Sequence, residues 1–289
     1  MDFHEGEGFH EGELAVQRGA GVQEQARRLQ GMLDPAELSG GAAMFLATQR
    51  FAALTARDHD GVLWTSPLAA PPGFLRGDGD ALRIATVPRD GDPLRDMPVG
   101  QQVGLIAIDF NSRRRMRING ILLAADDDGL EVHVDQAYGN CPQYIHRHDT
   151  SSMPEHDRVF GHGTALSVAA QTLVGDADTF FLGTTHPSRG NDASHRGGPP
   201  GFVRVTSPTT LWWPDFPGNN MFNSFGNLAV DDEAALLFTD FTTGATVQLS
   251  GTARLQWTEP GAPGDDGGVG RRVEFAASAV VASRVSAYA

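Results

Sequence analysis

Three arginines at alternate positions in the stretch NSRRRMRING are of a type and spacing that can bind an anion. Alternate residues of a β-strand share a face, so Arg113, Arg115 and Arg117 are expected to point the same way. Guanidinium groups side by side repel one another unless solvent, carboxylates or an anionic ligand lies over them. The pattern is typical of an anion site or, alternatively, of a solvated edge strand with salt bridges.

Histidines and carboxylates gather in a polar stretch in mid-chain. None of them has the i, i+4 spacing or another recognised metal-ligand pattern, so we expect a polar connector and no metal site. The members are His146, His148, His156 and His162, with Asp149, Glu155 and Asp157.

The tail repeats FHEGE at residues 3–7 and 9–13. Its His and Glu residues suggest a metal site, but a repeated tail is better explained as an alternative start or a disordered extension. Cys141, the single cysteine, follows Asn140 at the start of an expected helix over 141–148. A helix dipole would lower the pKa of its thiol, whereas a lone cysteine is more commonly a buried apolar residue.

Composition excludes several kinds of chemistry. All 22 basic residues are arginines, so no lysine is present for a Schiff base or a phosphate-binding P-loop. One cysteine excludes an intrachain disulfide and any multi-cysteine zinc or iron–sulfur site. The sequence also lacks the GxSxG, HExxH and strand-associated GxGxxG motifs.

The net charge of −14 argues against nucleic acid or an anionic membrane surface as a partner. The longest apolar runs fall well short of the roughly 20 residues that a spanning helix needs. No signal peptide opens the chain, so we expect a cytoplasmic protein.

Two halves of the chain repeat the same landmarks in the same order. PPGF occurs at 71–74 and at 199–202, an offset of 128 residues. Further on, Asp109-Phe110 matches Asp240-Phe241 and Gly120 matches Gly251, both at an offset of 131. A period of this length indicates a duplicated domain.

Each copy consists of short apolar stretches between turn residues, with a strand expected to begin at PGF, which favours an all-β barrel or sandwich. Helices are few, and residues 14–33 are the main candidate despite two glycines. We expect a tail and helix over 1–40, a first barrel over 41–148, a linker over 149–163 and a second barrel over 164–289.

The stretches DASHRGGPPGFVRV, WWPDFPGNN, NSFGNLAVDDEAALLF and VQLSGTARL resemble the FMN-binding split-barrel family typified by pyridoxamine 5'-phosphate oxidase. FHEGELAVQ, RRRMRING and AYGNCPQYI look like a bacterial subgroup that fuses two such barrels in one chain. The resemblance implies a mainly β fold of two tandem Greek-key split β-barrels, a flavin at an interface and assembly as a homodimer. Other branches of the family bind deazaflavin or haem.

The resemblance places the flavin contacts in the second copy, which has Ser194, His195 and Arg196 where the first has Ser66, Pro67 and Leu68. Such a flavin site needs arginine donors and turn amides for the phosphate and an aromatic surface for the ring. Met221 departs from the pattern, since the family has a cation there. The expected contacts are Ser194, Arg196, Arg204, Trp213, Asn219 and Asn220.

These features predict an FMN-dependent oxidoreductase that acts on a small molecule, with a separate reductase as its electron partner. His186 and His195 are the candidates for a proton donor. The alternative is a flavin- or haem-binding carrier or sensor without turnover of its own, which the missing cation at Met221 favours.

Overall fold

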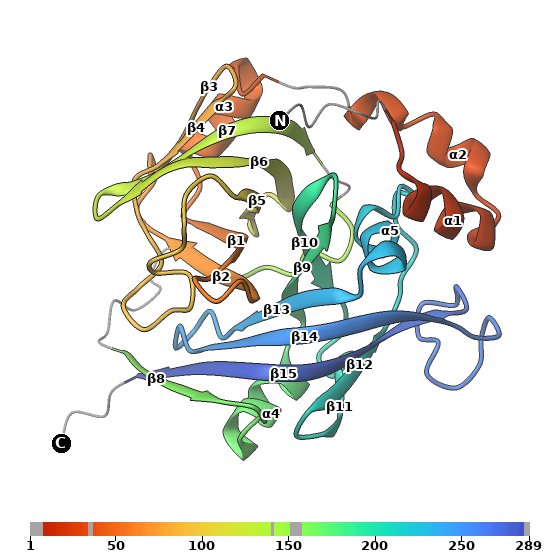
Figure 1. Cartoon of the computed structure of the whole chain (residues 1–289). Helices are drawn as coiled ribbons and strands as arrows, with labels where there is room; N and C mark the ends of the chain where they lie inside the picture. The colour runs from red at the N-terminus through yellow and green to blue at the C-terminus, as the bar shows by residue number, and fades with distance from the viewer. Residues whose placement is uncertain (1–7, 34–36, 140–141, 151–157, 286–289) are drawn as a thin grey trace.

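The chain's computed structural model describes residues 8–33, 37–139, 142–150 and 158–285. Two antiparallel sheets, one of seven strands and one of eight, make up most of it. Figure 1 shows the first sheet, in orange to yellow-green, beside the second, in green to blue. The first FHEGE copy, Cys141 and His156 lie outside the described residues.

The first sheet contains β1 (Phe51–Arg57), β2 (Leu63–Ala69), β3 (Leu75–Asp78), β4 (Ala81–Ile84), β5 (Gln102–Asp109), β6 (Arg114–Asp126) and β7 (Gly129–Gly139). The second contains β8 (Arg158–Gly163), β9 (Thr179–His186), β10 (Gly190–Gly197), β11 (Arg204–Ser207), β12 (Thr210–Pro214), β13 (Glu233–Thr239), β14 (Thr246–Trp257) and β15 (Arg271–Val285). The helices are α1 (Glu11–Ala20), α2 (Gln23–Arg27), η1 (Gln30–Leu33), α3 (Gly40–Ala47), α4 (Val168–Asp176) and α5 (Asn223–Val230).

Both sheets have the same strand order, β2-β1-β5-β6-β7-β4-β3 and β10-β9-β13-β14-β15-β12-β11, with β8 added beside β15. The registers agree as well: Leu54 pairs with Leu105 in the first sheet, and Leu182 with Leu236 in the second. These equivalent leucines differ by the offsets of 128 and 131 residues seen in the sequence. The chain is therefore two tandem Greek-key split barrels: the repeat predicted the duplication, and the family resemblance predicted the split barrels.

The matched glycines mark the same β-bulge in each barrel. The register shifts at Gly120 in the β6–β7 pair and at Gly251 in the β14–β15 pair. A Cβ on Gly120 would lie 1.9 Å from the His133 carbonyl oxygen, and one on Gly251 would lie 2.0 Å from that of Ala276. Only glycine allows the backbones to approach this closely.

PPGF forms a turn in both copies, so the expectation that a strand begins at PGF is wrong. The strands begin later, at Leu75 and Arg204. Gly73 and Gly201 have φ angles of +95° and +85°, which other residues rarely adopt. The phenylalanine after each glycine is buried and fixes the turn to its barrel core.

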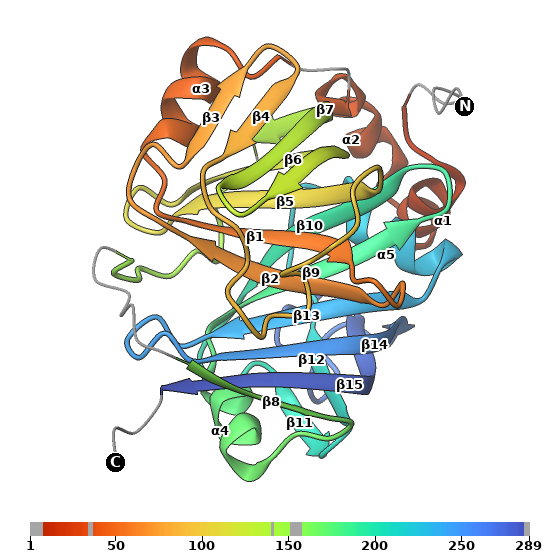
Figure 2. The same cartoon turned by 60° about the vertical axis from the view of Figure 1, so that its left-hand side comes forward.

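Each barrel has its own apolar core, and a third cluster joins the two. Phe51 and Phe110 from the first barrel pack with Phe181 and Phe241 from the second. Strand β10 lies against β5 and β6, while its counterpart β2 lies against β13 and β14. Figure 2 shows these strands stacked through the middle of the molecule. The barrels thus face each other through equivalent strands, as two copies related by a pseudo-twofold axis.

The helical expectations hold only in part. Residues 14–33 form not one helix but α1, α2 and η1, because Gly21 ends α1 in the left-handed conformation. The helix expected over 141–148 is wrong, since no described residue of that stretch is helical. Ile145 is instead buried between the barrels and His148 stacks on Phe241, so tertiary contacts hold this segment in a non-helical conformation with a turn at 143–144. Residues 158–163 of the expected linker form β8.

Within the described parts of the chain, every helix is too short or too polar to cross a membrane.

Candidate functional site

The arginine strand of the first barrel faces the PPGF-preceding strand of the second. Arg115 Nη1 lies 2.7 Å from His195 Nδ1, and Arg117 Nη1 lies 3.0 Å from Asp192 Oδ2. Strands β6 and β10 pack face to face at this point. The two features that the sequence predicted to bind an anion, 80 residues apart in the chain, are therefore brought together at the inter-barrel contact.

Arg113 does not share this face. It lies exposed in the turn before β6 with a φ of +54°, so strand alternation begins only at the next residue. Arg117 is buried against Asp192, which is the salt-bridge alternative that the sequence left open. Arg115 is the member of the trio that reaches a cleft.

The hydrogen bond from Arg115 determines the tautomer of His195. A guanidinium group only donates, so His195 Nδ1 accepts and the ring proton resides on Nε2. That Nε2 is buried and has no partner among the described residues. Burial, and then the charges of Arg115 and Arg196, hold the pKa of His195 well below its usual value. His195 is thus a neutral hydrogen-bond donor at neutral pH.

Arg196 adds a second buried cation on the same strand. Its guanidinium carbon lies 4.7 Å from the centre of the Phe225 ring, and its Nε has no hydrogen-bond partner among the described residues. Burial lowers the pKa of Arg196 to about 10, so it stays charged. The carboxylate nearby, Asp215, forms a buried ion pair with Arg271 at 2.9 Å and is already balanced.

These groups line a cleft of about 80 Å³ between the barrels, which we call the first cleft. Its remaining walls are largely aromatic, and Tyr144 packs on Phe216 with ring centres 5.1 Å apart. Positive charge and unsatisfied donors beside flat apolar walls suit an anion that carries an aromatic ring. The lining residues are Arg115, Gln143, Tyr144, His195, Arg196, Gly197, Phe202, Trp213, Pro214, Asp215, Phe216, Pro217 and Gly218.

Ser194 points away from this cleft, into a buried network. Its hydroxyl donates to the Leu182 carbonyl at 3.3 Å and accepts from Ser224 at 3.1 Å. Ser224 Oγ also lies 3.1 Å from Asp192 Oδ2. Ser194 is therefore linked to the Arg117–Asp192 pair through the Ser224 hydroxyl.

The other residues expected at the flavin lie in different surroundings. Arg204 pairs with Asp266 at 2.7 Å and stacks on Trp212, at the surface. Trp213 is almost fully buried in the second core, where it meets Phe180 edge to face, and it also lines the first cleft.

The PGNN turn is tied into a small apolar cluster. Asn219 Oδ1 accepts from the Met221 backbone N–H at 3.1 Å, and Asn220 adopts a φ of +64°. Met221 is fully buried against Leu33 and Tyr138. The position where the family has a cation thus holds an apolar core residue.

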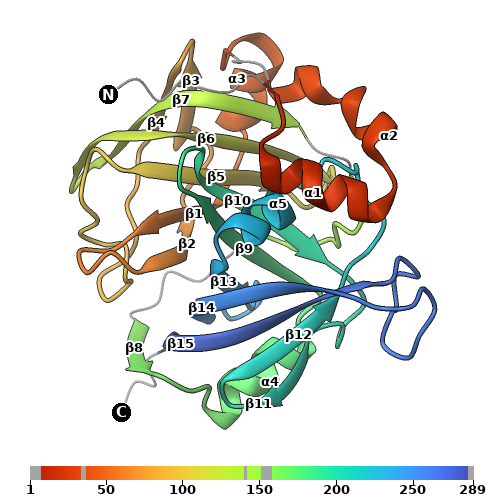
Figure 3. The same cartoon turned by 45° about the vertical axis from the view of Figure 1, so that its right-hand side comes forward.

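The second FHEGE copy is structured, so the expectation of a disordered extension is wrong for residues 9–13. His10 caps α1 with a reciprocal capping box to Glu13. Glu13 is buried and accepts from Asn223 Nδ2 at 2.5 Å, and burial raises its pKa to about 7. Figure 3 shows α1 lying along α5. The HEGE spacing is that of a capping box, a signal that the sequence analysis did not use.

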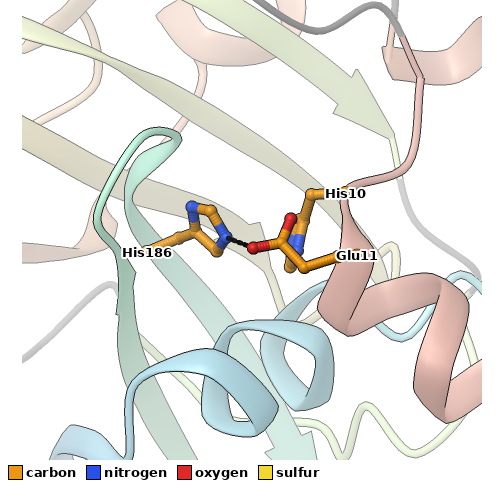
Figure 4. A group of neighbouring side chains, drawn as sticks. All are labelled: His10, Glu11 and His186. Carbon is orange, nitrogen blue, oxygen red and sulfur yellow. Dashed lines mark ion pairs between the residues drawn. The ribbon is translucent and has the colours of Figure 1, made fainter.

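His10, Glu11 and His186 form a group with potential metal ligands within 4.8 Å of one another (Figure 4). Metal-binding imidazoles usually donate their second N–H to an acceptor. Here each Nδ1 instead accepts a backbone N–H, from Gly12 and Ser188, both at 3.2 Å. Each Nε2 therefore carries the proton and offers no lone pair: His10 Nε2 donates to Asn227 Oδ1 at 3.1 Å, and His186 Nε2 lies 3.5 Å from Glu11 Oε1.

A scan against protein-family models and a search of curated proteins each give no match. Solved structures that match include HupZ from Group A Streptococcus, at 12% identity and a TM-score of 0.32, over 39% of this chain and 89% of that chain. A putative pyridoxamine 5'-phosphate oxidase from Lactobacillus delbrueckii matches at 14% and 0.33, over 41% and 94%. The FAD binding protein from Mycobacterium smegmatis matches at 15% and 0.30, over 42% and 96%.

These structural neighbours include proteins of the kind that the sequence resembles.

Proposed function

We propose that this chain is a flavin-dependent oxidoreductase that acts on a small molecule. The proposed flavin is FMN, bound at the first cleft. The observation that carries the proposal is the Arg115–His195 contact across the two barrels. Beside this contact, the buried His195 Nε2–H and the buried Arg196 Nε have no acceptor among the described residues. An unsatisfied buried donor is costly until an acceptor fills the position.

The donor set fits the anionic and acceptor-bearing parts of a flavin. Arg115 and Arg196 would bind phosphate or another anionic group, and His195 Nε2–H would donate to a ring acceptor. The cleft of about 80 Å³ is narrower than the ≈ 300 Å³ of typical ligand pockets. The proposal therefore includes movement of the Tyr144 segment, whose carbonyl oxygen closes over Gly197.

When bound, a flavin supplies hydride or electron transfer. The chain's own residues would orient it: the Arg117–Asp192 pair holds β6 on β10, and the aromatic walls exclude water. Both barrels contribute side chains from a single polypeptide, so the cleft needs no second chain, and the expected homodimer is not required for binding. A separate reductase as electron donor remains part of the proposal.

One observation favours the second candidate, a flavin carrier or sensor without turnover. Among the described residues that line the first cleft, the carboxylate is paired with Arg271 and the histidine is held neutral, so no ready proton donor faces a substrate. A haem would need a lone pair from His195 Nε2, which carries a proton here. A deazaflavin would need the same hydrogen-bond donors as FMN, namely Arg115, Arg196 and His195 Nε2–H.

The test is the visible spectrum of the purified chain, followed by titration with FMN and with a deazaflavin. Saturable quenching of flavin fluorescence near one flavin per chain is expected. Turnover of the bound flavin by a chemical reductant and an electron acceptor then separates an oxidoreductase from a carrier. A colourless chain that binds neither flavin overturns both candidates.

A further inference from the structure

The pseudo-twofold axis creates a second cleft at the position equivalent to the first. Pro67 and Ala69 on β2 line it where His195 and Gly197 on β10 line the first cleft, and Thr246 takes the place of Arg115. The strand registers establish these equivalences, since Leu54 pairs with Ser66 and Leu182 with Ser194. The second cleft has a volume of about 50 Å³. Its lining residues are Pro67, Ala69, Thr86, Val87, Arg89, Asp92, Phe160, Gly244 and Thr246.

The charge of the second cleft differs from that of the first. Arg117 corresponds to Gln248 and Arg196 to Leu68, so the cations on the two facing strands are lost. In their place a carboxylate, Asp92, lines the cleft with only 7% of its surface exposed. The two cations on the facing strands of the first cleft thus have no counterpart on the equivalent strands of the second, where Asp92, in the loop after β4, is a buried carboxylate.

Asp92 has neutral hydrogen-bond donors only. Its Oδ1 accepts from Ser66 Oγ at 2.5 Å and from the Leu94 N–H at 2.9 Å, and its Oδ2 accepts from Gln248 Nε2 at 3.1 Å. Within the described residues no ion pair reaches Asp92, and Arg89, which lines the same cleft, is not within 4.0 Å of it. Buried carboxylates are normally paired with a cation.

One acceptor in the same network has no donor among the described residues. Gln248 is fully buried, and its Oε1 has no donor among the described residues. Its amide group is already committed to Ser66 and Asp92. The orphaned atoms near the first cleft are donors, whereas the orphaned atom near the second is an acceptor. Burial without a cation also raises the pKa of Asp92 to about 6.

We propose that the second cleft is a binding site for a small primary ammonium ion with a short apolar chain, held by Asp92. The ammonium group supplies the positive charge that is missing among the neutral donors to this carboxylate. Pro67, Ala69, Val87 and Phe160 provide apolar walls for the carbon chain. The volume of about 50 Å³ limits the ligand to a few non-hydrogen atoms.

Alternatively, Asp92 could have a purely structural role and only stabilise the loop after β4. Its hydrogen bonds with Leu94 and Ser66 are consistent with that role. A purely structural carboxylate, however, would not make the cleft prefer a cation over a neutral ligand or an anion. Charge selectivity therefore separates the two roles.

The experiment uses the full chain and three probes of matched shape: n-propylammonium, propionate and 1-propanol. Calorimetric titration should show n-propylammonium binding at one site per chain, and binding of the anion and the alcohol at least about tenfold weaker. Equal binding of the alcohol, or no binding of the ammonium ion, overturns the proposal.

Two variants complete the test. Asp92→Asn retains an acceptor at Oδ1 and should weaken n-propylammonium binding at least about tenfold. Val87→Trp fills the cleft without touching the Asp92 hydrogen bonds and should abolish binding in a folded chain. Unchanged affinity in either overturns the proposal. Arg115→Thr, in the first cleft, should leave ammonium binding unchanged, so this result is independent of whether a flavin binds.

Discussion

Arg115 of the first barrel donates a hydrogen bond to Nδ1 of His195 of the second at 2.7 Å. This contact joins the barrels and also turns a buried histidine into a neutral donor beside two cations. The second barrel has Thr246 at the position equivalent to Arg115. Threonine is therefore a residue that this fold position accepts, and Arg115→Thr is the substitution that tests the contact.

Arg115→Thr should weaken flavin binding at least about tenfold, because one charge-assisted donor is lost and the tautomer of His195 is released. The measurement is a titration of flavin fluorescence. Arg204→Ala is the matched control, since Arg204 is occupied with Asp266 at the surface and should leave the affinity unchanged. Equal loss in both variants would contradict a flavin at the first cleft.

The same substitution should raise the pKa of His195. Burial is the main cause of its low value, and the Arg115 charge is the next. Removing that charge should move the pKa upward while leaving it below that of an exposed histidine. Proton NMR titration of the His195 ring measures the shift, and an unaltered titration would show that Arg115 does not act on the ring.

Breaking the Arg117–Asp192 pair should destabilise the chain by about 3–5 kcal/mol, because the remaining partner becomes a buried unpaired charge. The side chains are only 13% and 4% exposed. Arg117→Gln, which copies Gln248 of the second barrel, and Asp192→Asn are the single variants. Their combination should recover at least half of the loss in chemical denaturation. Additive losses would mean that the pair is not coupled.

Glu13 should make stability depend on pH. Burial raises its pKa from 4.5 to about 7, so the folded chain holds a proton that the unfolded chain releases. The stability is fully present below about pH 4.5 and falls as the pH rises to about 7, by about 3 kcal/mol. Glu13→Gln should flatten this part of the profile of unfolding free energy. A profile that keeps its slope in Glu13→Gln would assign the dependence to another group.

Gly120→Ala and Gly251→Ala should each destabilise their barrel by at least about 2 kcal/mol, because the new Cβ meets a backbone carbonyl across the bulge. Gly175→Ala is the control. A Cβ there meets nothing within 4 Å, and α4 should gain about 0.5–1 kcal/mol from the better helix former. Thermal unfolding of the three variants checks the pattern, and tolerance at either bulge would show that the backbones can separate.

The sequence by itself determined the duplication and the fold class. Aligned landmarks such as Asp109 and Asp240 carry local geometry with them, since each carboxylate accepts from the next turn's N–H groups and hydroxyl. Local patterns of this kind depend on a few neighbouring residues, so they can be recognised without coordinates. The presence of arginines suited to an anion was also visible at this level.

Only the tertiary structure decided which of these residues meet. Arg115 reaches His195 and Arg117 reaches Asp192 because β6 and β10 cross at the barrel contact, a relation that no sequence spacing encodes. Packing within the second barrel placed Ser194 in a buried network and committed Arg204 to Asp266. Contacts between the barrels hold residues 142–148 in a non-helical turn instead of the expected helix. Contacts between distant strands outweigh local propensity where they bury apolar rings and pair charges.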